Sequence, residues 1–286
     1  MTALLELISE HACFGGVQRF YRHASTAIGL PMRFSIFIPA TPAGARLPAL
    51  FYLAGLTCNE ETFMTKAGAQ RDAAEAGLIL IAPDTSPRGA GVPGEADDWE
   101  VGVGAGFYLD ATVAPWSEHY RMHSYLLELH ALAIAEFPVD ADRIGIFGHS
   151  MGGHGALVTA LRHPELFKSV SAFAPIAAPS LCPWGEKAFT TYLGADHADW
   201  AQYDASELMR KSTAPFPKGI LIDQGLGDKF LRTQLRPDVF EKACTQAGQR
   251  LEIRRHADYD HGYYFISTFM QDHIRFHADN LKAVAA

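Results

Sequence analysis

The stretch GHSMGGHG, residues 148–155, lies between a β-like apolar run and a helix-like apolar run. It gathers four glycines and one serine where a predicted strand passes into a predicted helix. A serine on such a sharp turn is forced into an unfavourable backbone conformation, so the residues two before and two after it must lack side chains. Gly148 and Gly152 occupy those places around Ser150, which indicates a nucleophile elbow.

The glycines have a second interpretation, which is that they only permit a close crossing of two backbones. The pattern G-x-S-x-G alone is weak, and the strand-to-helix context favours the elbow. Gly153 and Gly155 would then let the following helix lie close to the sheet. The helix N-terminus would aim backbone N–H groups at the reaction centre, and the Met151 N–H would be one donor of an oxyanion hole.

Composition and charge exclude several protein classes. The chain has 286 residues, 48% hydrophobic and 20% charged, which suits one α/β domain over residues 1–286. No stretch approaches the roughly 20 apolar residues of a membrane helix, and the first residues lack the basic group of a signal peptide, so we expect a cytoplasmic protein. The net charge of −8, without Lys or Arg runs, argues against nucleic acid. An anionic substrate would need a local basic group.

The four cysteines are widely separated and form no C-x-x-C pair. This spacing predicts reduced thiols, with neither a disulfide framework nor a zinc site. The cysteines are Cys13, Cys58, Cys182 and Cys244.

Apolar runs bounded by turn residues predict strands, and from residue 77 onward the runs are continuous, as in parallel strands buried on both faces. Helical stretches alternate with them, which predicts an α/β protein with a mostly parallel sheet and helices on both faces. The two N-terminal runs have no helix between them and are expected as antiparallel edge strands. The predicted strands are 32–40, 48–55, 77–84, 143–150, 169–175, 219–225 and 251–257, and the predicted helices are 61–76, 116–137, 152–162 and 236–247. The Gly- and Pro-rich segment 84–115 is expected as a loop that shapes a site.

A nucleophilic serine needs a base, and the base needs an acid to orient it. In the α/β-hydrolase arrangement these partners follow the serine in the order acid, then histidine. Asp228 lies in the loop after the strand GILIDQG and is preferred over Asp223, which lies inside the apolar run. His261, flanked by a glycine beyond the last strand, is preferred over His256, which is expected to lie on that strand.

The second oxyanion donor should come from the loop after an earlier strand. The strand PALFYLAG leads into this loop, and the Leu56 N–H is the natural candidate. Cys58 is either a thiol at the rim of the pocket or a buried, inert cysteine.

Other polar groups have ordinary interpretations. Two histidine pairs at i, i+4, His119/His123 and His273/His277, have the spacing of helix metal ligands but lack the glutamate of H-E-x-x-H. We therefore expect helix-surface or capping roles and no metal. Asp97, Asp98 and Glu100 are expected to be solvated loop charges.

Together these motifs resemble the S-formylglutathione hydrolase family, also called esterase D, along nearly the whole chain. The stretches that carry the resemblance are LAGLTCNEETF (53–63), GAGFYLDAT (104–112), PW (115–116), GHSMGGHGAL (148–157), SVSAFAPI (169–176), PWGEKAF (183–189), YLG (192–194), LIDQG (221–225) and YDHGYYFISTFMQDHI (259–274). Three places depart from the family pattern and leave substrate preference open. They are Asp98 to Val101, Gly227 to Lys229, and Gly262.

The resemblance implies an α/β-hydrolase fold, a triad of Ser150, Asp228 and His261, and hydrolysis of S-formylglutathione to formate and glutathione. It implies further that Leu56 and Met151 are the oxyanion donors, that Cys58 is the family's pocket-side thiol, and that the loop with Trp184 and Lys187 forms part of the pocket wall. It also implies no cofactor, a homodimer, and activity on short-chain and aryl esters. Two alternatives stay open: acyl transfer to an alcohol on the same fold, and a non-catalytic binding module.

Overall fold

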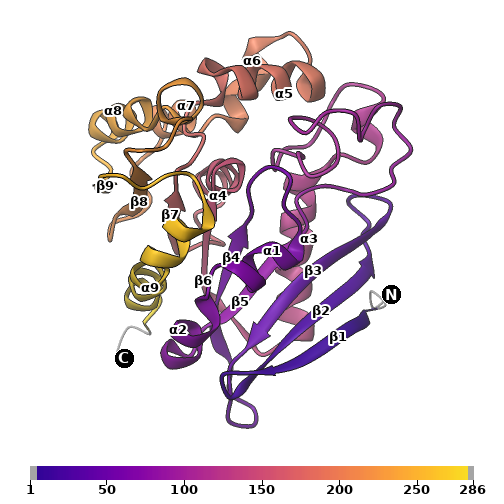
Figure 1. Cartoon of the computed structure of the whole chain (residues 1–286), viewed down its shortest axis with the longest axis vertical. Helices are drawn as coiled ribbons and strands as arrows, with labels where there is room; N and C mark the ends of the chain where they lie inside the picture. Colours follow the sequence, from indigo (N-terminus) through magenta and orange to yellow (C-terminus); the bar gives the residue numbers. More distant parts are fainter. Residues whose placement is uncertain (1–4, 283–286) are drawn as a thin grey trace.

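The strand that leads to Ser150 lies at the centre of one sheet. In the computed structural model, which describes residues 5–282, nine strands follow the order β1-β2-β3-β5-β4-β6-β7-β8-β9 (Figure 1). The strands are β1 (Glu6–Cys13), β2 (Gly16–Ala24), β3 (Pro31–Ile38), β4 (Leu47–Leu53), β5 (Ile79–Pro83), β6 (Val139–His149), β7 (Ser169–Phe173), β8 (Ile220–Gly225) and β9 (Leu251–His256). From β5 to β9 in this order every pair is parallel.

The expected fold class is confirmed, with two differences at the N-terminal side. β1, β2 and β3 form the antiparallel edge, and β3 pairs antiparallel with β5. The run 48–55 was expected at that edge, but β4 is central and parallel to both neighbours because β5 inserts between β3 and β4. The sequence analysis did not predict β1 and β2. Their polar and exposed residues hide the apolar signal that the buried strands carry.

Each expected helical segment is helical, with breaks at specific residues, but the helices at 183–193, 197–200, 205–210 and 263–280 were not expected. The segment 61–76 forms two helices, because Gly68 between them adopts a left-handed φ of 70°. The segment 116–137 begins with a short 3-10 turn before its long helix. The helices are α1 (Glu60–Lys66), α2 (Ala69–Ala76), α3 (Met122–Glu136), α4 (Met151–Arg162), α5 (Pro183–Leu193), α6 (His197–Trp200), α7 (Ala205–Arg210), α8 (Pro237–Ala247) and α9 (Tyr263–Asn280), with short turns η1 (Trp116–Glu118), η2 (Pro179–Leu181), η3 (Ala201–Tyr203) and η4 (Leu231–Leu235).

Helices cover both faces of the sheet, as alternating side chains of β4 show. Phe51 stacks on His130 of α3. The next residue, Tyr52, points to the other face and stacks on Phe63 of α1 with ring centroids 3.8 Å apart. The core fills both layers between sheet and helices. None of the helices between residues 5 and 282 is long and apolar enough to cross a membrane.

The carboxyl ends of the parallel strands lie at one edge of the sheet, where α/β proteins build their sites. The loops after β4, β6, β8 and β9 meet there, and α5 and α6 lie beyond this edge at the top of Figure 1. Segment 84–115 contains no helix or strand apart from isolated bridges, as expected of a loop. The expected domain spans 1–286, and its ends, 1–4 and 283–286, lie outside the described residues.

Candidate active site

Ser150 occupies a strained corner between β6 and α4. Its φ of 57° and ψ of −118° lie in a region that side chains rarely adopt. A Cβ at Gly152 would overlap the Leu53 carbonyl oxygen, and a Cβ at Gly148 would overlap the Gly152 carbonyl oxygen. The Ser150 N–H donates to the Phe173 oxygen at 3.0 Å, which ties the corner to β7. Gly148 and Gly152 therefore allow the backbones of α4 and β4 to cross closely, and this crossing forms the sharp turn at Ser150. The two interpretations of the motif describe the same feature.

The other two glycines of the motif have different neighbours. A Cβ at Gly153 would lie 2.9 Å from the Pro175 Cβ, just after β7, and 3.4 Å from the Ala172 Cβ of β7, so this glycine does bring the helix close to the sheet. Gly155 does not: it faces the ring of Tyr108, whose hydroxyl donates to the Ala54 oxygen at 2.9 Å. Gly155 therefore makes room for a side chain that fixes the end of β4.

His261 and Asp228 form a close pair. His261 Nδ1 lies 2.6 Å from Asp228 Oδ2, and the Phe230 N–H donates to Asp228 Oδ1 at 2.8 Å. Asp228 is 5% exposed. The His261 ring packs edge-on against Phe230 and lies 4.4 Å, centroid to centroid, from His149. These contacts fix the imidazole orientation that a general base requires.

Ser150 and His261 line the same cavity of about 180 Å³. No hydrogen bond joins them among the contacts of residues 5–282, so this link of the expected triad is not closed. Such bonds often tighten only when substrate is bound. The lining residues are Gly55, Leu56, Cys58, Trp99, His149, Ser150, Trp184, Phe230, His261 and Tyr263.

The loop after β4 lies directly against the serine. A Cβ at Gly55 would lie 3.3 Å from the Ser150 Cβ. Leu56 lines the cavity, and its N–H donates to no group in the described part of the chain. Met151 is the first residue of α4, where N–H groups have no partner within the helix. Both N–H groups are therefore placed where they could bind an oxyanion.

Cys58 lines the cavity and is half-buried, as expected of a thiol at the rim of the pocket. Burial raises the pKa of its thiol. A thiol with a raised pKa stays protonated at neutral pH and is a poor nucleophile. This direction of the pKa shift favours Ser150 over Cys58 as the nucleophile of the cavity.

Trp184 and Lys187 lie on α5, a helix and not the expected loop, and only Trp184 lines the cavity. The Trp184 Nε1–H donates to Glu100 at 2.9 Å. Lys187 Nζ lies 2.5 Å from both Asp98 and Glu100. Both acids were expected to be solvated loop charges, and both stay partly exposed while they pair with Lys187 on either side of Trp99, which lines the cavity.

Sequence reasoning missed four residues of the pocket wall. Trp99, Phe230 and Tyr263 carried no motif of their own, although Phe230 follows the acid loop and Tyr263 follows the histidine loop. His149 directly precedes the serine, which was an available signal. Burial, and then the neighbouring His261, lower its pKa well below the usual value, so the His149 ring is neutral and its Nε2 has no partner in the described residues.

The rejected alternatives form a second aspartate–histidine pair elsewhere. His256 Nε2 lies 3.2 Å from Asp223 Oδ1, but neither residue lines the cavity. Asp223 is fully buried and also accepts two hydrogen bonds from Arg254, at 2.6 and 2.5 Å. Burial alone would raise the pKa of Asp223, but hydrogen bonds from His273 and Arg254 hold it well below the usual value. His273 is itself neutral because burial lowers its pKa, so Arg254 supplies the compensating charge.

The expectation of surface roles was wrong for three of the four paired histidines. His273 and His277 are fully buried on α9, and both contact the Ser171 hydroxyl of β7. His123 is buried and its Nε2 lies 3.1 Å from Nε2 of His163. Within residues 5–282 no group of three or more His, Cys, Asp or Glu side chains is placed to hold a metal ion.

Comparisons with known proteins agree on one family. Residues 25–276 match the model of the family described as "Putative esterase". The S-formylglutathione hydrolase of Rattus norvegicus is 52% identical over 98% of this chain and 99% of its own length. The solved S-formylglutathione hydrolase of Agrobacterium tumefaciens is 50% identical, with a TM-score of 0.93 over 96% of this chain and 99% of that one. The serine hydrolase FphF of Staphylococcus aureus, 20% identical with a TM-score of 0.74, shares the fold.

The two aspartates should respond differently to the same substitution. We expect Asp228→Asn to keep the fold but lower kcat on an aryl ester about 10³- to 10⁴-fold, because the imidazole loses its orienting carboxylate. We expect Asp223→Asn to lower the free energy of unfolding by about 3 kcal/mol, because Arg254 loses its buried partner. Urea titrations and initial rates on both variants measure these effects.

The contribution of Asp223 should also depend on pH. Because its pKa is lowered in the fold, the contribution is complete above the unfolded value of about 4 and is lost as the pH falls from there toward the folded value. An Asp223→Asn protein with wild-type stability and reduced kcat would reverse the assignment of the two residues.

Proposed function

The chain belongs to the S-formylglutathione hydrolase family of esterases, and from this premise we propose that it hydrolyses the thioester S-formylglutathione to formate and glutathione through a covalent intermediate on Ser150. It is a hydrolase enzyme, which excludes the non-catalytic alternative. The observation that carries the proposal is the 2.6 Å contact between His261 and Asp228 at the cavity that Ser150 also lines.

The residues suit acyl transfer in two steps. His261, oriented by Asp228, takes the Ser150 proton as Oγ attacks the formyl carbon, and the Leu56 and Met151 N–H groups bind the oxyanion. The C–S bond breaks and the glutathione thiolate leaves, accepting the proton from His261. Water then gives a proton to His261 and attacks the formyl ester, Ser150 recovers that proton, and formic acid leaves and ionises to formate in solution.

The size and lining of the cavity favour a small acyl group. Its volume of about 180 Å³ is below the 300–1,000 Å³ range of sites for drug-sized ligands. Its aromatic wall, which includes Trp99, Trp184 and Phe230, would also accept short-chain and aryl esters. No step of this chemistry requires a cofactor.

The Ser150→Ala variant should lose at least about 10³-fold in kcat/KM for S-formylglutathione with an unchanged melting temperature, because the Cys58 thiol in the same cavity has a raised pKa and is a poor substitute nucleophile. Rates for S-formylglutathione, S-acetylglutathione and an aryl acetate, measured side by side on the wild type, test the acyl preference. Wild-type turnover by Ser150→Ala would refute the nucleophile. Partition of the acyl group to an added alcohol in preference to water would identify an acyltransferase instead.

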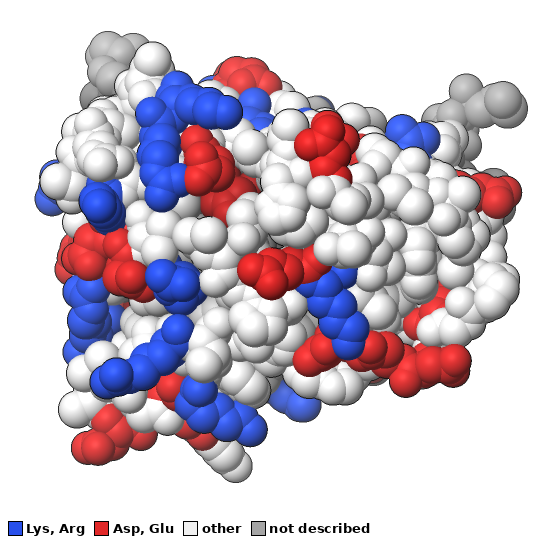
Figure 2. Space-filling model, turned by 90° about the horizontal axis from the view of Figure 1, so that it is seen from above, with Lys and Arg blue, Asp and Glu red and all other residues white. Residues whose placement is uncertain are grey.

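A local cation lies beside the catalytic acid although the net charge is −8. Seen from above, Lys and Arg gather toward the side where Figure 1 places α7 and α8 (Figure 2). Lys229 is exposed, directly follows Asp228, and places its Nζ 4.9 Å from the centroid of the Phe230 ring. It takes part in no ion pair within residues 5–282, so it is free to meet a carboxylate of an anionic thiol leaving group.

Reversal of this charge should raise KM for the anionic thioester. We expect Lys229→Glu to raise KM for S-formylglutathione about 3- to 10-fold and to leave KM for a neutral aryl acetate within twofold, since exposed ion pairs contribute up to about 1 kcal/mol each. Lys242→Glu, an exposed lysine on α8, is the matched control. The effect should shrink at high salt. An equal KM change for both substrates would contradict the role of Lys229.

We further propose that residues 1–286 act as one domain and that the protein is a cytoplasmic homodimer. One sheet around a contiguous core supports the single domain. Four free thiols suit a reducing compartment. Leu7 and Ile8 on the edge strand β1 and Phe14 in the turn after it, each about half exposed, give an apolar surface for a second copy. Sedimentation velocity should give about twice the chain mass, with Leu7→Glu shifting it to the monomer; a monomeric wild type would refute the dimer.

A further inference from the structure

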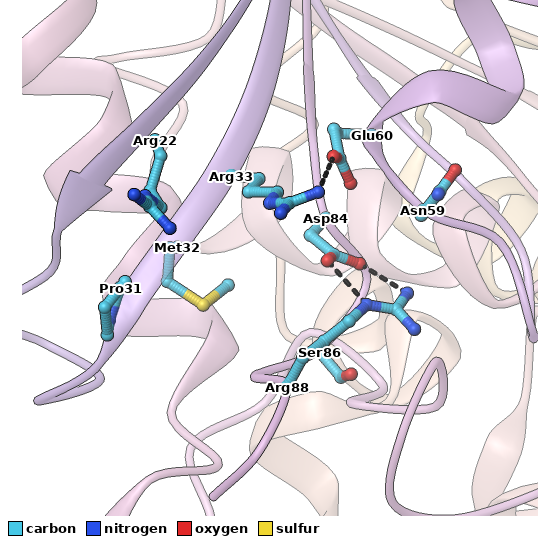
Figure 3. A pocket seen from close by; sticks show the side chains of 9 residues that line it. All are labelled: Arg22, Pro31, Met32, Arg33, Asn59, Glu60, Asp84, Ser86 and Arg88. Atoms are coloured by element: carbon cyan, nitrogen blue, oxygen red, sulfur yellow. Dashed lines mark hydrogen bonds and ion pairs between the residues drawn. The ribbon is translucent and has the colours of Figure 1, made fainter. Parts of the chain in front are cut away.

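A second cavity of about 390 Å³ lies next to the Cys58 loop. It is formed by β2, β3, the start of α1 and the segment after β5 (Figure 3), and its volume is in the range of small-molecule sites. Neither Ser150, Asp228 nor His261 lines it. The lining residues are Arg22, Pro31, Met32, Arg33, Asn59, Glu60, Asp84, Ser86 and Arg88.

Glu60 is a buried carboxylate in this cavity that the catalytic mechanism does not use. It is 3% exposed, and no other described residue donates a hydrogen bond to its carboxylate. Its nearest cation is Nη1 of Arg33 at 3.8 Å, beyond hydrogen-bond distance, and Figure 3 shows the two side chains pointing toward each other. Burial, and then the neighbouring Asp84, raise the pKa of Glu60 to about 7. A buried charge without hydrogen bonds is costly, so this position is poised to gain a partner.

The carboxylate of Asp84, in the same cavity, has a full set of hydrogen-bond donors, in contrast to that of Glu60. It accepts hydrogen bonds from Nε and Nη2 of Arg88, both at 2.7 Å, and from the Thr85 N–H at 2.7 Å. Arg33, in contrast, donates no hydrogen bond to any other described residue, and half of its side chain is exposed. The cavity therefore holds one carboxylate and one guanidinium, side by side, with their hydrogen-bonding capacity unused.

We propose that this cavity binds a small ligand by an α-amino carboxylate head group, with the ammonium on Glu60 and the carboxylate on Arg33. An ammonium offers three donors to a carboxylate, and a guanidinium matches a ligand carboxylate with two parallel hydrogen bonds. A simple anion would meet Glu60 and Asp84, and a simple cation would meet Arg33 and Arg88. Only a zwitterion pairs with both unused groups.

The cavity adjoins the wall of the catalytic pocket. Asn59 lines the charged cavity, and its neighbour Cys58 lines the catalytic one. The Cys58 carbonyl accepts hydrogen bonds from Thr85 Oγ1 at 2.5 Å and from Arg88 Nη2 at 3.1 Å. The head group could belong to the γ-glutamyl residue of a glutathione thioester, a possibility that rests on the proposed function. It could instead belong to a separate amino acid that affects the catalytic cavity through the loop of Cys58 and Asn59.

The test is calorimetric binding of L-glutamine, whose side-chain amide resembles a γ-glutamyl link, to the full chain at pH 8. N-acetyl-L-glutamine removes the ammonium and L-glutamine amide removes the carboxylate. We expect saturable binding of L-glutamine, and at least about tenfold weaker binding of both analogues. Binding of either analogue as tight as that of L-glutamine, or no saturable binding of L-glutamine, overturns the proposal.

Paired variants locate the binding. Glu60→Gln and Arg33→Met should each raise the Kd for L-glutamine at least about tenfold. Glu61→Gln, the next residue of α1, and Arg71→Met on α2 should keep the wild-type Kd, because neither residue lines the cavity. Melting curves show whether each variant folds. If Glu60→Gln does not fold, the Kd of Arg33→Met for L-glutamine alone tests the proposal. An unchanged Kd in Arg33→Met overturns the proposal.

Inhibition kinetics then identify the source of the head group. Competitive inhibition of S-formylglutathione hydrolysis by L-glutamine assigns the cavity to the substrate, and inhibition or activation of kcat assigns it to a separate effector. Both results uphold the head-group chemistry. Because binding is measured without turnover, failure of thioester hydrolysis would refute the proposed function and leave the binding result standing.

Discussion

The close approach of the α4 backbone to the end of β4 sets the geometry of the active edge. Two glycines bring the Gly152 backbone against the Leu53 carbonyl, and this crossing forces Ser150 into its left-handed conformation. The same approach places Gly55 against the Ser150 side chain, so the loop that carries Leu56 begins directly beside the serine. A strained corner of this kind persists only when its surroundings over-determine it, and here two parallel strands and one helix do so.

Two aspartate–histidine pairs, Asp223 with His256 and Asp228 with His261, lie close together in the sequence but differ in their surroundings. The surroundings decide which pair can take part in proton transfer. Asp223 and its partners lie between the sheet and α9, where Arg254 neutralises the carboxylate. Asp228 lies five residues later, beyond the end of β8, where a backbone N–H and one imidazole satisfy it and leave the ring facing a cavity. An imidazole can exchange protons with a substrate only in the second setting.

Sequence reasoning succeeded where the signal is local. The elbow around Ser150, the continuous runs of the parallel strands and the position of Asp228 beyond a strand all follow from spacing along the chain. It failed where partners are distant in sequence: β5 inserts between β3 and β4, His273 and His277 find Ser171 across the core, and Lys187 pairs with acids of a loop about 90 residues earlier. β1 was missed because its polar, exposed residues carry no pattern of burial.

Asp223, Asp228 and Glu60 are buried carboxylates with different degrees of compensation. Asp223 has a guanidinium and histidines, and Asp228 has a backbone donor and the imidazole it orients. Glu60 has only a distant ion pair. The fold supplies hydrogen-bond donors to the carboxylates of Asp223 and Asp228. The lack of such donors at Glu60 is therefore a local property of its cavity. Because a carboxylate there costs stability unless a donor arrives, the cavity is best understood as a site whose last partner comes from solution.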